Sequence, residues 1–199
     1  MEHTEVLISF DPDSLAEEQN KKSLGVVNII KLKRREKSKV SMCANGEPNQ
    51  KFVMREEAKL PAINMEGILD TMVIDEYEYR KVATFDIPGT YLHIYLTKDK
   101  FTLLLLEGNF VDIVCDINPN YKQHVRFKYG RKTLYLRILK EIYGMIKSSL
   151  LWYNIYASVL KGMGFQLNHY DMCVTNNCIS EKQCTVDWYV DENNISHLE

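Results

Sequence analysis

Acidic residues stand at the ends of two apolar segments, and their types and positions suit the binding of a divalent cation. Asp86 follows the apolar residues 82–85, and Asp191 and Glu192 follow residues 188–190. Carboxylates at strand ends cannot be buried cheaply. If the two segments form neighbouring strands, three carboxylates converge at one sheet edge, with the oxygen ligands that Mg²⁺ prefers beside phosphates and water. The alternative is that these acids simply begin turns, where Asp is common.

The elements that must position these acids follow from residue patterning. β-branched and alternating runs predict strands at 26–32, 39–44, 81–86, 101–107 and 133–140, and a terminal hairpin over 185–197 with its turn at 191–194. Apolar residues at helical spacing predict helices over 62–78, begun at Pro61, and over 148–163, capped by Ser148 or Ser149 and ended by Gly164. Residues 1–25 show no sustained period, and we expect them to be poorly ordered.

Charge is unevenly distributed in a chain whose net charge is −2. Residues 1–20 carry six acids and no Lys or Arg, whereas residues 21–59 carry eleven Lys or Arg against four acids. Residues 121–147 carry eight Lys or Arg against one acid, Glu141. The two basic segments could form a phosphate-binding face. The alternative is ordinary solvated surface.

Cysteine spacing and hydropathy restrict the class of protein further. The five cysteines include no CxxC pair, which argues against a zinc site and favours reduced, mostly buried thiols in an intracellular protein. No apolar run reaches about 18 residues, so we expect no membrane span. The first residues have no basic and apolar regions typical of a secretory signal, so we expect the protein not to be secreted.

Three motifs, in order, resemble the reverse transcriptases of copia-type LTR retrotransposons. VATFDIPGTYL (82–92) resembles their first-motif strand and turn, IYGMIKSSLLWY (142–153) is similar to their YGLKQSPRxWY block, and QCTVDWYVDENNISH (183–197) resembles their YVDD hairpin. The likeness covers roughly residues 25–199. It implies an α+β fold, with a fingers-like portion over 26–80 and a palm portion over 81–199 in which helices pack on one face of an antiparallel sheet. The chain would stop before the rest of the palm, the thumb and the ribonuclease H domain.

The resemblance also implies roles for single residues. Asp86 and Asp191 match the metal-binding aspartates, and Glu192 stands in the place of the third carboxylate. Mg²⁺, with Mn²⁺ as the alternative ion, would support nucleotidyl transfer from a deoxynucleoside triphosphate onto an RNA or DNA primer-template. Tyr91 matches the aromatic residue that packs under the incoming sugar, and Gly144 matches the glycine that lets the chain approach nucleotide and template. From the residues alone, Tyr91 could equally be core and Gly144 a plain turn.

Several positions depart from the family pattern. Glu192 keeps the charge of the second Asp but adds a methylene, and a displacement of about 1 Å can cost on the order of a hundredfold in rate. Basic residues of the family are replaced in the fingers and in the second block, at Ser41, Glu47, Gln50, Ile146 and Leu150. These losses suggest an element drifting without selection.

Three functions therefore remain open. The first is an RNA-directed DNA polymerase fragment of impaired activity. The second is a non-catalytic retrotransposon remnant that at most binds nucleic acid through residues 31–39 and 122–147. The third is a protein-interaction domain whose basic face meets an acidic partner. In each reading we expect the protein in a cytoplasmic particle or the nucleus.

Overall fold

The computed structural model describes residues 5–15, 19, 22–32, 38–46, 62–97 and 100–198, with the backbone alone described for 28–32 and 38–40. Glu47, Gln50 and Pro61 lie outside these ranges. The chain divides into two compact units, one from Met1–Met54 with Tyr91–Ser148 and the other from Arg55–Thr90 with Ser149–Glu199. Each unit combines two stretches of the chain, so the boundaries of the units do not coincide with the expected division at residue 80.

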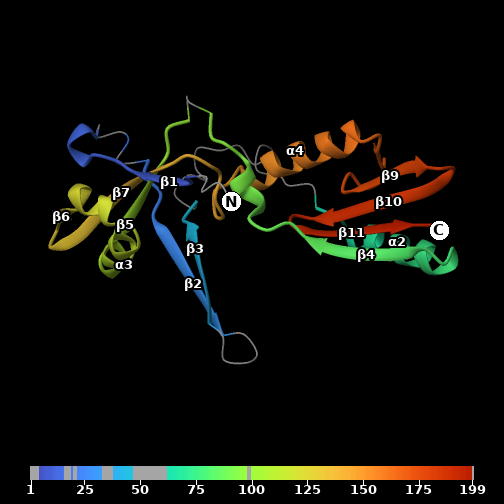
Figure 1. Cartoon of the computed structure of the whole chain (residues 1–199), viewed down its shortest axis with the longest axis horizontal. Helices are drawn as coiled ribbons and strands as arrows, with labels where there is room; N and C mark the ends of the chain where they lie inside the picture. Colours follow the sequence, from blue (N-terminus) through green and yellow to red (C-terminus); the bar gives the residue numbers. More distant parts are fainter. Residues whose placement is uncertain are drawn as a thin grey trace. The chain divides into compact units, whose positions relative to one another are not determined.

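The first unit is built on an antiparallel sheet whose central strand is β7, Arg131–Ile138 (Figure 1). The residues Leu134, Leu136 and Ile138 are almost fully buried, as the alternating pattern predicts. Three strands pair with β7: β5 (Leu103–Glu107), β6 (Arg126–Lys128) and β1 (Leu7–Ser9). β1 lies in the segment that we expected to be poorly ordered, and its three residues are too few to show a period.

Shorter elements complete the first unit. β2 (Val26–Leu32) and β3 (Ser38–Ala44) form the expected antiparallel hairpin. Further elements in the described part of this unit are the α-helix α3 (Asn109–Ile117) and the 3₁₀ helices η1 (Pro12–Ser14), η4 (Thr90–His93) and η5 (Pro119–His124). The core joins Leu24 and Ala44 to apolar residues of β5, α3 and β7.

The second unit contains a five-stranded antiparallel sheet in the order β4-β11-β10-β9-β8 (Figure 1). Its strands are β4 (Lys81–Asp86), β8 (Gln166–Leu167), β9 (Val174–Ile179), β10 (Lys182–Tyr189) and β11 (Glu192–His197). Its helices are α2 (Met65–Tyr77) and α4 (Ser148–Gly162), close to the predicted bounds. Gly164 has φ +93, the left-handed conformation expected of a residue that ends a helix.

Helices cover both faces of this sheet. Residues 184–188 of β10 are buried in succession, although neighbouring side chains in a strand point to opposite faces. Trp188 and Val186 pack with Tyr153, Ala157 and Leu160 of α4. On the opposite face, residues of α2, β4, β10 and β11, Asp187 of β10 among them, line a shared cavity. The α+β class with antiparallel sheets is confirmed, but the expected placement of helices on one face differs from this arrangement.

Other expectations can be compared with the described residues. The five cysteines are unpaired, and three of them, Cys115, Cys173 and Cys184, are buried. No helix in the described ranges is long and apolar enough to span a membrane.

Candidate carboxylate site

The strands that carry the candidate metal ligands are neighbours. β4 pairs with β11 in antiparallel register, and the Cα atoms of Asp86 and Glu192 are partners. Residues directly opposite each other in an antiparallel pair project from the same face of the sheet. Both side chains are exposed. The prediction that the two acidic segments meet at one sheet edge is therefore confirmed for this pair, which we call the outer pair.

Asp191 lies in the turn between the two strands rather than in a strand. β10 ends at Tyr189 and β11 begins at Glu192, so Val190 and Asp191 form a two-residue turn. The expected turn at 191–194 was wrong, because the alternation of the hairpin continues through Asn193 and Asn194, which pair in β11. Val190 has φ +59, an unfavourable conformation for a β-branched residue.

Three hydrogen bonds hold this strained turn. The indole Nε1 of Trp152 in α4 donates to the carbonyl oxygen of Val190 at 2.8 Å. The backbone N–H of Ile87 donates to the carbonyl oxygen of Asp191 at 3.0 Å, and Asn193 Nδ2 donates to the same oxygen at 2.8 Å. Backbone strain of this kind persists only where the surroundings over-determine it, and it is concentrated at functional sites.

The turn after Asp86 is also well defined. Pro88 precedes Gly89, which has φ +65, the residue order of a type II turn. Thr90 is fully buried, and its hydroxyl donates to the carbonyl oxygen of Ile87 at 2.7 Å. The chain then leaves the second unit.

Tyr91 and Gly144 belong to the first unit, whereas the three carboxylates belong to the second. Tyr91 is 6% exposed, and its ring centroid lies 4.6 Å from that of Tyr143. Gly144 has φ +92, and a Cβ atom there would collide with the carbonyl oxygen of Ala44. Core packing and close backbone contact thus give each residue a structural role, and the nucleotide-binding roles stay predictions.

The outer pair borders a cavity of about 840 Å³ on the α2 face of the sheet. Two further acids, Asp75 of α2 and Asp187 of β10, line the same cavity but are only 7% and 8% exposed. We call them the inner pair. Sequence reasoning missed both, because the alternation of Asp187 with Val186 and Trp188 suits a strand with one solvated face.

The carboxylates that line the cavity can be compared with the ligands that a metal ion requires. Among the described residues, no three His, Cys, Asp or Glu side chains lie close enough together to hold one ion. Mg²⁺ is commonly bound by one or two carboxylates, with waters and substrate phosphates as its other ligands. The exposed outer pair fits that donor set, whereas an arrangement of two ions would need Asp191 as a further ligand.

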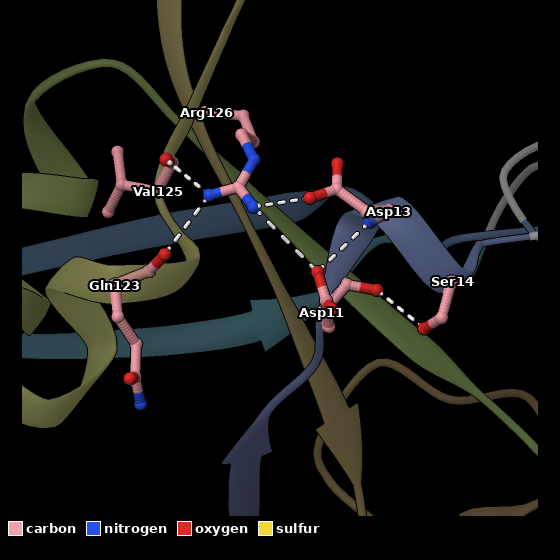
Figure 2. Close-up of polar contacts among 6 residues, drawn as sticks. All are labelled: Asp11, Asp13, Ser14, Gln123, Val125 and Arg126. Carbon is pink, nitrogen blue, oxygen red and sulfur yellow. Dashed lines mark hydrogen bonds and ion pairs between the residues drawn. The ribbon is translucent and has the colours of Figure 1, made fainter.

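Two basic residues of the segment 121–147 form ion pairs within the first unit. Arg126 Nη2 lies 2.7 Å from Asp13 Oδ2 and 3.8 Å from Asp11 Oδ1, and its Nη1 donates to two backbone carbonyl oxygens (Figure 2). Lys132 Nζ lies 2.6 Å from Asp112 Oδ1. The acids of the N-terminal segment therefore serve partly to pair with this basic segment.

Two more of its cations contact aromatic rings. The ammonium of Lys140, a residue that is 5% exposed, lies 4.4 Å from the ring centroid of Tyr95. The guanidinium of Arg137 lies 5.2 Å from the ring centroid of Phe101. The exposed basic residues of the segment are Lys122 in η5 and, on either side of the turn between β6 and β7, Lys128 and Arg131.

Comparison with known proteins adds no relative: the sequence matches no protein-family model and no curated protein.

Proposed function

We propose that this chain is part of an RNA-directed DNA polymerase of the copia-type retrotransposon class, with impaired nucleotidyl transfer. The observation that carries the proposal is the register of β4 and β11, which sets Asp86 opposite Glu192 beside the turn that contains Asp191. The three sequence motifs that resemble the family supply the rest of the argument. The palm and fingers assignments belong to this proposal.

The residues of the outer pair would hold a divalent ion through their exposed oxygens. When bound, such an ion lowers the pKa of an attacking hydroxyl and stabilises charge on a leaving pyrophosphate. The turn bonded to Trp152, Ile87 and Asn193 would keep the carboxylates oriented without further ordering. Glu192 would carry its charge one methylene farther from the backbone than Asp would, which supports slow turnover.

Primer extension tests the proposal. The full chain is incubated with oligo(dT) on poly(rA) and thymidine triphosphate, in Mg²⁺ and in Mn²⁺. We expect weak incorporation by the natural chain, a gain for Glu192→Asp and no incorporation for Asp86→Asn. Absence of incorporation by both the natural chain and Glu192→Asp would refute the polymerase proposal.

A second candidate function is nucleic-acid binding without catalysis. The tip of the β6–β7 hairpin favours this second function. Tyr129 is 94% exposed and Phe127 is 74% exposed, and the exposed Lys128 and Arg131 are close to them in the sequence. Aromatic faces beside cations suit stacking on single-stranded bases, which contributes about 1–3 kcal/mol per base.

Fluorescence anisotropy with labelled oligo(rU) separates this function from the first. We expect affinity to fall steeply with salt, and Tyr129→Ala to weaken binding by about fivefold or more. Tyr170→Ala, in the second unit and 96% exposed, is the matched control. Equal binding by Tyr129→Ala and Tyr170→Ala would remove the hairpin tip from consideration.

A further inference from the structure

One carboxylate that lines the cavity beside α2 is buried, and one of its two oxygens has no hydrogen-bond partner among the described residues. Asp75 is 7% exposed and lines the cavity, and its Oδ1 has no hydrogen-bond partner among the described residues. A buried acceptor without a donor is costly, by roughly 1–3 kcal/mol. Because Asp75 lies on an otherwise regular helix, the feature points to a donor that the described chain itself does not supply.

The neighbouring polar atoms are also acceptors. Asp187 is 8% exposed, and its Oδ2 accepts a hydrogen bond from Asn194 Nδ2 at 3.1 Å. That bond leaves the amide oxygen Oδ1 of Asn194 buried and without a partner among the described residues. Burial raises the pKa of Asp187, the hydrogen bond from Asn194 opposes this, and the charge of Asp75 adds to the rise. Three side chains thus present oxygens to one space.

The residues that line the cavity supply little positive charge to balance its acids. Among the described lining residues the one base is Arg80, and its guanidinium is already used. Its Nε and Nη2 lie 2.7 and 2.6 Å from Glu78 Oε2, and its Nη1 donates to Thr185 Oγ1 at 2.8 Å. The acids Asp75, Glu76, Asp86, Asp187 and Glu192 therefore outnumber the bases, and the field in the cavity favours a cation.

The remaining walls are apolar. Ile63, Ile68, Met72 and Phe85 line the cavity together with the inner pair. Small-molecule sites typically combine such walls with a few convergent polar groups in a space of about 300–1,000 Å³. A bare or hydrated metal ion would gain nothing from these walls, and the described residues contain no three-ligand cluster for one.

We propose that this cavity binds a small organic cation, with an ammonium or amidinium group between Asp75 and Asp187 and an apolar body against Met72 and Ile68. The cation pairs with the negative charges of Asp75 and Asp187, which both line the cavity. The proposal does not depend on polymerase activity, because it involves the inner pair and not the outer pair.

Isothermal titration of the full chain with benzamidine, and with its neutral analogue benzamide, tests the proposal at pH 8. The two compounds have nearly the same shape. Benzamidine is a cation with two NH₂ groups, whereas benzamide is neutral and has a carbonyl oxygen in place of one of them. We expect saturable binding of benzamidine at least about tenfold tighter than that of benzamide, because hydrogen bonds to charged groups are the stronger class. Equal affinities, or no binding of either compound, would overturn the proposal.

Variants then locate the site. Asp75→Asn and Asp187→Asn should each weaken benzamidine binding by about tenfold and leave benzamide unaffected. Asp70→Asn, an exposed acid on the same helix outside this cavity, is the matched control and should bind as the natural chain does. Full affinity in both inner-pair variants would contradict the proposed position. If either variant fails to fold, the comparison of the two compounds on the natural chain still decides.

Discussion

Two pairs of acids border one cavity, and they differ in burial far more than in chemistry. Asp86 and Glu192 are exposed at strand ends beside a hairpin turn, whereas Asp75 and Asp187 are 7% and 8% exposed under α2. An exposed carboxylate can share a hydrated ion with phosphate oxygens. A buried carboxylate in an apolar space instead favours protonation or a desolvated organic cation. The two pairs therefore predict two different ligands, because they differ in burial although they line the same cavity.

The two pairs are also held by different kinds of interaction. The outer pair depends on backbone carbonyl oxygens in the turn, which accept hydrogen bonds from Trp152, Ile87 and Asn193. At the inner pair the side chain of Asn194 holds Asp187, and Arg80 nearby bonds Thr185 and Glu78. Substitutions of the inner-pair acids should therefore affect folding as well as ligand binding, whereas substitutions of Asp86 and Glu192 should affect ligand binding alone.

The largest expected effect separates the ligands of the two pairs. Asp86→Asn should weaken Mn²⁺ binding by about 10- to 100-fold, the range seen when support of a metal site is lost, and should leave benzamidine affinity unchanged. Asp187→Asn should weaken benzamidine binding and leave the Mn²⁺ affinity unchanged. Water proton relaxation measures the bound Mn²⁺, and titration calorimetry measures benzamidine.

A crossed outcome would break this comparison. If Asp187→Asn weakened Mn²⁺ binding as strongly as Asp86→Asn, all four acids would form one cation site, and the division into two pairs would be incorrect. Asp70→Asn corrects both measurements for the loss of one negative charge on this unit.

The next largest effect concerns folding at the inner end. Arg80→Ala removes hydrogen bonds to Glu78 and Thr185 from a guanidinium whose side chain is 1% exposed. We expect the free energy of unfolding to fall by about 1.5–3 kcal/mol, the usual worth of hydrogen bonds to a charged group. Urea denaturation followed by circular dichroism measures the change.

Lys161→Ala serves as the control, because Lys161 is exposed in the last turn of α4. It should alter the unfolding free energy by no more than about 0.5 kcal/mol. An equal loss in both variants would show that Arg80 has no special role beneath the cavity.

The outer pair was predictable from the sequence and the inner pair was not. Asp86 and Glu192 interrupt apolar runs at their ends, which is where strand patterning places a sheet edge. Asp187 alternates with Val186 and Trp188 in a way that suits a strand with one solvated face. Only the packing of α2 on that face shows that Asp187 is buried, and such tertiary coverage leaves no mark on the periodicity of β10.

The same limit explains other differences. Alternation in the terminal hairpin predicted its strands correctly but not its turn. Val190 adopts φ +59 in the turn, a conformation in which Asn or Gly would be expected. β1 and β8 have only three and two residues, too few to show a period. The helices 62–78 and 148–163 were close to their observed bounds. In the first helix Met65, Leu69, Met72 and Val73 are nevertheless exposed, so the apolar spacing predicted the helix but not the face that it buries.

A smaller effect is expected from the strained turn. Val190→Asn should stabilise the fold by about 0.5–1 kcal/mol, because Asn tolerates the left-handed conformation that disfavours other L residues by about 1–2 kcal/mol. Val159→Asn, at an exposed helical valine of α4, should show no such gain. Thermal unfolding compares the two variants, and a loss of stability in Val190→Asn would argue that the valine side chain itself supports the turn.

The smallest effect is a dependence of stability on pH that belongs to Asp187. Burial raises the pKa of Asp187 above its ordinary value, and the charges of Asp75 and Asp171 add to this while Asn194 opposes it. Between the unfolded and the raised folded pKa, the folded state binds more protons, so its unfolding free energy falls as pH rises through that interval. Asp187→Asn should remove this decline, and Asp70→Asn should retain it. Urea unfolding from pH 4 to pH 8 measures the difference, and parallel curves for the natural chain and Asp187→Asn would show that the ionisation of Asp187 does not contribute to this dependence.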